Sequence, residues 1–185
     1  MKNVKLASRY AQALFDFAVE KNQLEQVYQD ILLIMQTLKS NRELTLAIEC
    51  PVVPYTKKVK VFTGIFEQAV SKVSFGFLKL VIAKKREPAL LLICFEFIRL
   101  YNKYHNIKVL DFITAQEVRE PVMEKLKALM HERTGAMIEV KSIITPQIIG
   151  GFIVRMDDFV FDASILKQIN TLKREFSHNI YQAGF

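Results

Sequence analysis

Residues 77–114 read FLKLVIAKKREPALLLICFEFIRLYNKYHNIKVLDFIT, and the pattern of the chain changes within this stretch. Its first part is apolar at helical spacing, and the Glu-Pro pair at 87–88 suits the first turn of a second helix. From 107 to 114, β-branched and aromatic residues dominate, as they do in a strand. We therefore place a boundary at Asn106, with a helical region before it and a mixed region after it.

The region before this boundary predicts a bundle of six helices. Its apolar residues recur every three or four positions, and it shows no strand-like alternation. A connector with two prolines, residues 50–55, separates the third helix from the fourth. The predicted helices cover 3–21, 23–39, a short stretch after 41, 56–68, 71–85 and 87–105.

The region after the boundary predicts a small α+β domain. A hairpin is expected around Asp157 and Asp158, because Asp tolerates the left-handed backbone of a tight turn. Asp162 or Ser164 can cap the last helix. The predicted elements are a strand at 107–114, a helix at 117–134, strands at 138–144, 151–156 and 159–161, and a helix to about 178. The predicted fold is mainly α, with the six-helix bundle at 1–106 and the α+β domain at 107–185.

Composition indicates a folded globular protein. Of 185 residues, 51% are hydrophobic and 24% are charged, a balance that disordered chains do not have. The longest apolar runs are far shorter than a bilayer span. The first residues lack the apolar core of a signal peptide, so we expect the protein to stay in the compartment of its synthesis.

The net charge of +7 lies entirely in the first 106 residues, which hold 16 Lys and Arg against 9 Asp and Glu. Such a basic region suits nucleic acid, an anionic membrane or an acidic protein, and charge alone does not choose between them. Two lysine-rich clusters, 57–60 and 84–86, keep nucleic-acid binding open as the alternative function. No nucleic-acid-binding motif surrounds them, and short lysine clusters are usually solvated helix faces or ends.

The sequence contains no pattern typical of catalysis. Gly150 and Gly151 lack the Lys-Ser/Thr of a phosphate-binding loop, and we interpret them as a bend or a close backbone approach. Cys50 and Cys94 have neither metal-ligand nor redox spacing and suggest reduced, buried thiols. The remaining candidates fit turns and helix ends: Asp157, Asp158, Asp162, His105, His131, His178, Ser71, Ser74 and Ser164. We predict no enzyme activity, no cofactor and no metal.

Two predicted helices carry more apolar surface than one stripe requires. In the fifth helix, apolar residues occupy more than one face, whereas an ordinary surface helix buries a single stripe. In the first helix, Ala7, Ala11 and Ala18 form a stripe of small residues that would let another helix approach closely. The two helices could form a groove for an amphipathic helix of a partner, or both stripes could be the core of the bundle.

Four stretches, taken together in order and spacing, resemble the delta subunits of F-type ATP synthases, which are called the oligomycin-sensitivity-conferring protein in mitochondria. They are SRYAQALFDFA (8–18), FLKLVIAKKREPALLLICFEFIRLYNKY (77–104), FITAQEV (112–118) and ITPQIIGGFIVRMDDFVFDASILKQINTL (144–172). The resemblance covers nearly the whole chain. Thr145 stands where the family often has Asp, and Ala163 stands where Gly is common, so the departures concern turns.

The resemblance implies a non-catalytic stator subunit. The N-terminal domain would bind the N-terminal helices of alpha subunits in the catalytic head, and the C-terminal domain would bind the C-terminal ends of the b subunits in the peripheral stalk. The expected place is the cytoplasmic face of a bacterial inner membrane, peripheral and held through the complex, with no nucleic-acid partner. We expect head contacts at Tyr10, Ala11, Leu14, Phe75, Leu78 and Ile82, and stalk contacts at Ile165, Leu166, Ile169 and Leu172.

Overall fold

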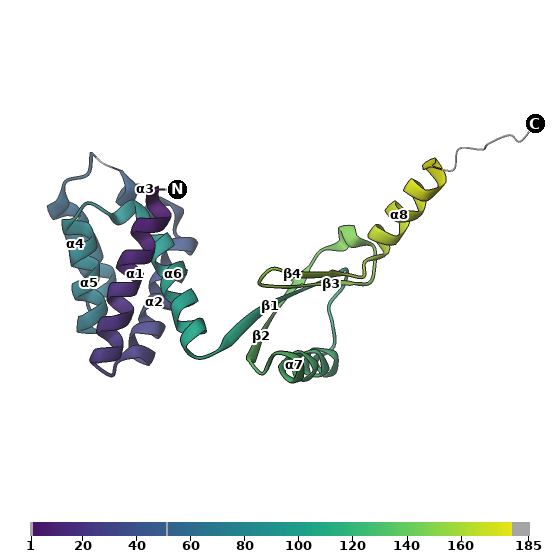
Figure 1. Ribbon diagram of the computed structural model, residues 1–185. Coiled ribbons are helices and arrows are strands. Elements are labelled where there is room, and N and C mark those ends of the chain that lie inside the picture. The colour runs from purple at the N-terminus through teal and green to yellow at the C-terminus, as the bar shows by residue number, and fades with distance from the viewer. Residues whose placement is uncertain (1, 51, 179–185) are drawn as a thin grey trace, which may run out of the picture. The chain divides into compact units, whose positions relative to one another are not determined.

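The structure, a computed structural model, describes residues 2–50 and 52–178 (Figure 1). The chain divides into two compact units, Met1–Tyr104 and His105–Phe185, so the boundary in the sequence lies two residues before Asn106, where the sequence pattern changes. The first unit is helical, and the second combines a four-stranded sheet with helices. The predicted fold class, a six-helix bundle followed by a small α+β domain, is therefore confirmed.

Within its described residues, the first unit consists of six α-helices and one 3-10 helix. They are α1 (Lys2–Glu20), α2 (Leu24–Ser40), α3 (Arg42–Glu49), α4 (Tyr55–Phe66), α5 (Lys72–Ala83), η1 (Glu87–Ala89) and α6 (Leu90–Tyr104). Each lies where the apolar periodicity predicted a helix. The sixth begins with the 3-10 turn η1, since Pro88 occupies the first turn, where its missing N–H has no helical partner to lose.

The interior of this unit is centred on α1 and α6, which make the most extensive helix–helix contact in the described chain. The small residues of α1, Ala7, Ala11 and Ala18, have no exposed surface. On the same side of α1, Phe15 packs against Phe97 of α6 with ring centroids 6.0 Å apart. The small-residue stripe therefore serves the close approach of the chain's own sixth helix.

A buried carboxylate fixes the start of α5. The Ser71 hydroxyl accepts a hydrogen bond from the backbone N–H of Ser74 at 3.3 Å, so Ser71 caps the helix as expected. The backbone N–H of Ser71 donates in turn to the Asp30 carboxylate of α2 at 2.9 Å, and Asp30 is almost fully buried. A negative group at this position also complements the positive end of the helix dipole. The beginning of α5 is thus tied to α2.

An ion pair inside the bundle links α4 to η1. Lys58 donates to Glu87, and both side chains are almost fully buried. Lys58 belongs to the lysine cluster at 57–60 that the sequence suggested as a solvated basic face. For Lys58 this interpretation is wrong, because its partner lies 29 residues away and no local pattern announces it. The cluster therefore offers less positive surface than its sequence suggests.

The second unit contains a mixed sheet with strand order β2-β1-β3-β4. Strand β1 pairs with β2 in parallel and with β3 in antiparallel orientation, and β3 pairs antiparallel with β4. The elements are β1 (Ile107–Thr114), α7 (Glu120–Thr134), β2 (Met137–Ile144), η2 (Pro146–Ile148), β3 (Phe152–Met156), β4 (Phe159–Asp162) and α8 (Ile165–His178). The predicted order of strand, helix, three strands and helix is confirmed.

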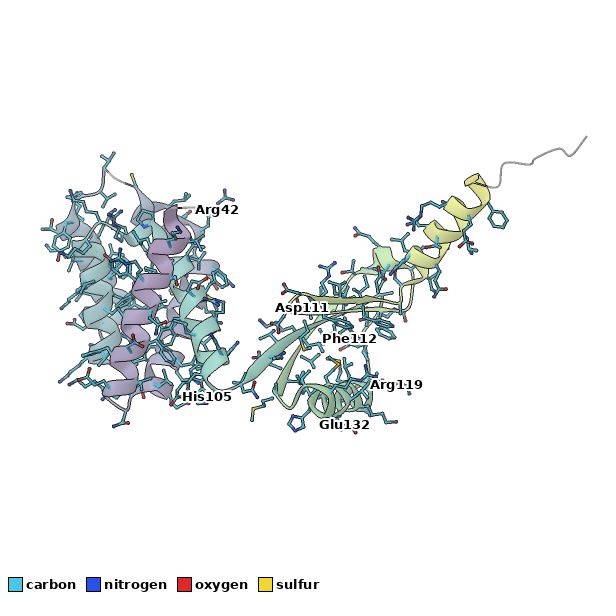
Figure 2. The ribbon with its side chains drawn as sticks, viewed as in Figure 1. Arg42, His105, Asp111, Phe112, Arg119 and Glu132 are labelled. Carbon is cyan, nitrogen blue, oxygen red and sulfur yellow. The ribbon has the colours of Figure 1, made fainter. Side chains whose placement is uncertain are left out.

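Helix α7 covers one face of this sheet and packs on a cluster of buried hydrophobic residues there. Leu110 and Phe112 of β1, with Val154 and Met156 of β3, are buried beneath partly buried residues of α7. Figure 2 labels Phe112 on this side of the sheet. The parallel β1–β2 pair requires a crossover connection, and α7 supplies it. The helix ends at Gly135, whose left-handed backbone (φ 62°) makes the predicted stop.

The predicted start of α7 is wrong by one turn. The sequence suggested a helix from Glu117, whereas the structure begins it at Glu120, with Pro121 in the first turn. Proline fits the first turn but disfavours helix in the residues before it. The chain before Glu120 is instead irregular, and Val118 packs against the sheet core.

The glycine pair and the hairpin behave as the sequence predicted. Met156 pairs with Phe159 across the two-residue turn, and Asp157 has a positive φ of 50°. Gly151 has a φ of +76°, and a Cβ placed there would lie 2.2 Å from the backbone oxygen of Ala163. A Cβ on Gly150 would lie 2.7 Å from Ile165 Cδ1. The two glycines therefore allow the backbone leading into α8 to approach closely.

The N-terminus of α8 is capped by Ser164. Its hydroxyl accepts the backbone N–H of Lys167 at 3.2 Å, while its own N–H donates to the Asp162 carboxylate at 2.9 Å. Hydrogen bonds from the Ser164 side chain and backbone lower the pKa of Asp162, with a smaller contribution from Lys167. The predicted cap is confirmed, and together with the glycine pair it fixes where α8 begins.

Candidate functional site

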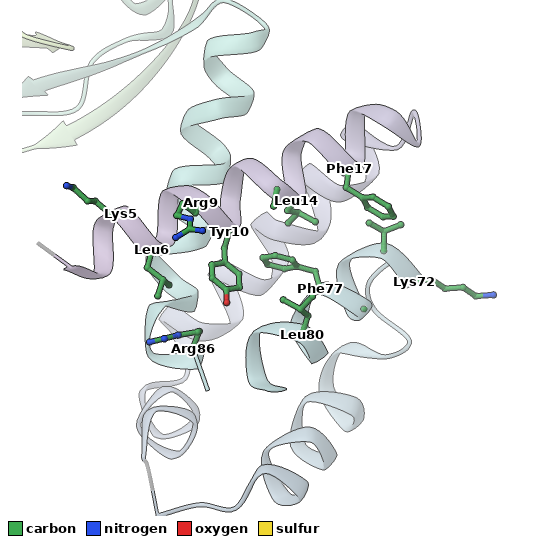
Figure 3. Close-up of a pocket in the computed structure, with 13 residues that line it drawn as sticks. Lys5, Leu6, Arg9, Tyr10, Leu14, Phe17, Lys72, Phe77, Leu80 and Arg86 are labelled. Carbon is green, nitrogen blue, oxygen red and sulfur yellow. The ribbon is translucent and has the colours of Figure 1, made fainter. Parts of the chain in front are cut away.

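A groove of about 1090 Å³ runs along the first unit between α1 and α5 (Figure 3). Its residues are Lys5, Leu6, Arg9, Tyr10, Ala13, Leu14 and Phe17 from α1, Lys72, Val73, Gly76, Phe77 and Leu80 from α5, and Arg86 after α5. From Lys5 to Phe17, α1 covers twelve residue steps, or about 18 Å, the length of roughly three helical turns. The groove is therefore long enough for a short helix.

The floor of the groove is apolar. Tyr10 and Phe77 meet edge to face at its centre, with ring centroids 6.5 Å apart and the planes at 65°. Phe17 and Leu80 are 43% and 47% exposed, respectively, so a large part of each apolar side chain faces water. Burying that surface against a partner would be favourable by about 25 cal/mol per Å². This face of the bundle is suited to an apolar partner surface.

Two small residues leave room in the middle of the groove. Ala13 of α1 and Gly76 of α5 both line it and are both exposed. A Cβ placed on Gly76 would have no atom within 4 Å. Glycine inside a helix costs about 1 kcal/mol relative to alanine, and here no contact within the chain requires it. Gly76 therefore keeps free the space that a larger side chain would fill.

Every charged residue along the groove is basic. Lys5, Arg9 and Arg86 lie toward one end, whereas Lys72 lies toward the other, the end where Phe17 lies (Figure 3). Arg86 is placed by the end of α5, where Lys85 adopts a left-handed backbone (φ 55°). The Arg86 N–H donates to the Val81 carbonyl and the Lys85 N–H to the Ile82 carbonyl, the two bonds of a Schellman motif. The backbone at the end of α5 thus sets the position of one of the four basic residues along the groove.

The second unit has an exposed apolar stripe on α8. Ile165, Leu172 and Phe176 are 41%, 50% and 76% exposed, and the half-buried Ile169 lies between them at helical spacing. Leu166, at the edge of this stripe, is 37% exposed. Helix α8 contacts the rest of its unit mainly through η2, so most of its apolar face is uncovered in the described chain. Such a helix is typical of a surface that binds a partner.

The described residues contain no group of three or more His, Cys, Asp and Glu close enough to hold a metal ion. Cys94 is buried, and burial raises the pKa of its thiol to about 12, so it stays protonated and unreactive at neutral pH. Cys50 is half-buried rather than fully buried as expected. The apolar groove and the α8 stripe are therefore the features that a function must explain.

Comparison with known proteins assigns the chain to a family. The family model of the ATP synthase delta (OSCP) subunit matches residues 6–176. The chain belongs to the ATP synthase delta (OSCP) family. This confirms the predicted function: it is a non-catalytic stator subunit of the peripheral stalk of the rotary ATP synthase.

Individual relatives of this delta subunit match along nearly their whole length. It is 31% identical to ATP synthase subunit delta of Cytophaga hutchinsonii over 97% of this chain and 98% of the relative. It is 33% identical to the same subunit of Parabacteroides distasonis over 94% of this chain and 97% of the relative. In fold it is similar to a chain in the cryo-EM structure of the Toxoplasma gondii mitochondrial ATP synthase hexamer, with a TM-score of 0.74 and 23% identity, over 93% of this chain and 97% of that chain.

The structure separates the six head-contact residues expected for this delta subunit into two groups. Tyr10 and Leu14 line the groove, although Leu14 is only 3% exposed and forms part of its floor. Ala11, Leu78 and Ile82 are at most 1% exposed, and Phe75 is 8% exposed, so these four lie in the bundle interior. They face the interior because each helix turns one apolar stripe inward. The four expected stalk residues lie together on α8, three of them exposed and Ile169 half-buried.

Sequence reasoning missed several groove residues of the delta subunit. They are Lys5, Leu6, Arg9, Ala13, Phe17, Lys72, Val73, Gly76, Phe77, Leu80 and Arg86. One signal was available: Gly76 interrupts a helix that is otherwise apolar on several faces, and glycine is an unfavourable residue inside a helix. Among the described residues, no helix is both long and apolar enough to span a bilayer.

Proposed function

We propose that this delta subunit joins the catalytic head to the peripheral stalk through two separate surfaces. In this proposal the α1–α5 groove of the first unit binds an N-terminal helix of an alpha subunit, and the α8 stripe of the second unit binds the C-terminal ends of the b subunits. The proposed location is the cytoplasmic face of a bacterial inner membrane, where the complex holds the subunit. In this role the subunit transmits force between the head and the stalk.

The observation that carries this proposal is the shape of the groove. Its floor is apolar although the bundle core is already complete behind it, with Leu78, Val81 and Ile82 buried on the inner side of the same helix, α5. Helix α5 therefore has one apolar face for the fold and another facing outward. A three-turn amphipathic helix matches the length, and the small residues Ala13 and Gly76 leave space for its side chains.

Replacing Gly76 with Leu is expected to block the head-binding surface while the fold is kept. The new side chain would extend into the groove, because a Cβ at this position meets no atom of the protein within 4 Å. We expect binding of the full-length protein to the N-terminal peptide of its own alpha subunit to fall at least about tenfold, measured by isothermal titration calorimetry. Thermal stability should not fall, since leucine favours a helix interior more than glycine by up to about 1 kcal/mol.

The matched control for this substitution is Gly64→Leu. Gly64 also lies inside a helix, α4, and its surroundings are equally open. It lies outside the groove, so peptide affinity should stay at the wild-type value. Equal affinities for wild type and the Gly76→Leu protein would contradict the groove as the head-binding surface.

The stalk surface is tested by Leu172→Asp, which places a charge in the middle of the exposed stripe on α8. A buried unpaired carboxylate at an interface costs several kcal/mol, so co-purification with the b subunits should be lost. The control is Asn170→Asp, which adds the same charge to an exposed position on the polar side of α8. Retained b-subunit binding by the Leu172→Asp protein would rule out this face. Binding of the alpha-subunit peptide should be unchanged in both variants.

A further inference from the structure

We propose that the α1–α5 groove selects its helix by charge as well as by apolar contact: its occupant carries carboxylates on both flanks of the apolar stripe, with most of them at the Lys5, Arg9 and Arg86 end. This inference rests on the proposed function, since it names the chemistry of the helix that the groove takes. Beyond that function, a helix with flanking carboxylates is expected to bind more tightly than one that offers the same apolar stripe alone.

The first support is the sign of the lining. Four of the thirteen residues along the groove are charged and all four are cationic, while the remaining nine are uncharged. The four cations are exposed; in Figure 3, Arg9 and Arg86 lie beside the apolar floor, while Lys5 and Lys72 lie at its two ends with their side chains extending outward. An amphipathic helix seated on that floor places its flanking residues beside the margin of the floor. Glutamates there would meet cations, and lysines there would meet charges of their own sign.

The second support is the uneven placement of the charges. Three cations lie where the N-terminal part of α1 meets the end of α5, and Lys72 alone lies at the opposite end (Figure 3). Arg86 is set there by the Schellman motif. A helix with its carboxylates gathered at one end would therefore bind in one direction. Charge would fix the orientation of the helix, while the apolar floor supplies most of the affinity.

The shape of the groove favours a peptide helix over nucleic acid. A nucleic-acid site requires cations spaced along a path that follows the phosphates. Here the centre of the groove is Tyr10, Ala13, Gly76 and Phe77, which offer no charge between the two ends. Displacement of a bound peptide by an oligonucleotide would indicate nucleic-acid binding instead, and it can be measured with the same peptides.

The test uses three synthetic helical peptides of equal length with one shared apolar stripe. Their flanking positions are all Glu, all Gln or all Lys. The protein contains no Trp, so a single Trp in the peptide stripe reports binding to the full-length protein by fluorescence. Because four exposed ion pairs are individually weak, we expect the Glu peptide to bind about tenfold more tightly than the Gln peptide. The Lys peptide should bind more weakly than the Gln peptide.

Salt and variants show where the preference arises. Raising salt from about 0.1 M to about 1 M shortens the screening length from about 10 Å to about 3 Å and should bring the Glu and Gln peptides close to equal affinity. The triple variant Lys5→Gln, Arg9→Gln and Arg86→Gln should lose most of the preference, whereas Lys72→Gln should lose less. Gly76→Leu should weaken all three peptides, which would locate the binding in the groove.

Each contrary result has a distinct meaning. Equal affinity for the Glu and Gln peptides at low salt, with binding still lost in the Gly76→Leu protein, would overturn the charge selection and leave the groove function intact. Failure of all three peptides and of the alpha-subunit peptide to bind would overturn the groove function itself. Displacement of the Glu peptide by a short DNA duplex at equal concentration would overturn the inference in favour of nucleic acid.

Discussion

The Ala11→Asp protein is expected not to fold its N-terminal unit. Ala11 has no exposed surface and lies on the side of α1 that packs against α6. A carboxylate there would be buried without a cation, at a cost of several kcal/mol, and its volume would push the two helices apart. Since small proteins are stable by only about 5–15 kcal/mol, this is enough to unfold the bundle. Far-UV circular dichroism during urea denaturation would measure the loss.

Ala13→Asp is the matched control on the same helix. Ala13 lies two residues further along α1, is exposed and lines the groove. Its substitution should leave the unfolding free energy within about 0.5 kcal/mol of wild type, as surface changes usually do. Binding of the alpha-subunit peptide should nevertheless be weakened, because the new carboxylate faces the apolar stripe of the occupant. A folded Ala11→Asp protein of normal stability would contradict the α1–α6 packing described above.

Ala11 and Ala13 also illustrate what the sequence could and could not predict. Helical spacing identified the apolar stripes of the first and fifth helices, and the elements formed where that spacing placed them. Spacing does not say which stripe faces the interior, because core contacts and partner contacts require the same residue types. The alanine stripe of α1 faces α6, and the neighbouring stripe with Tyr10 and Phe17 lines the groove.

Local signals were most reliable where a single residue has a specific backbone role. The Gly135 stop, the Asp157 turn, the Ser164 cap and the close approach at Gly151 follow from chemistry that acts over a few residues. The helix expected from Glu117 begins instead at Glu120, because Pro121 in its first turn disfavours helix in the residues before it. Contacts between distant segments left no such signal, and the strand order β2-β1-β3-β4 is one example.

The Lys58–Glu87 pair is another long-range contact, and removing one partner is expected to have a large effect. In Lys58→Met, the Glu87 carboxylate would remain almost fully buried without its cation, and its Oε2 already has no hydrogen-bond partner. Breaking a buried pair in this way typically costs about 3–5 kcal/mol. The midpoint of urea denaturation should therefore fall sharply. A surface pair provides the control: Arg99→Met removes an exposed partner of Glu96 and should cost less than about 1 kcal/mol.

The double variant Lys58→Met, Glu87→Leu separates the charge from the packing. With both charges gone, no ion is left buried, and apolar replacements of similar size are often neutral or stabilising at such sites. We expect stability to return to near wild type, and a double variant as unstable as Lys58→Met would show that packing at the site accounts for the loss.

Glu87 directly follows Arg86, so the same double variant also tests whether the Lys58–Glu87 ion pair holds Arg86 in position beside the groove. If the double variant is stable but no longer prefers the Glu peptide, the ion pair holds Arg86 in place; if the preference persists, the Schellman motif alone does so.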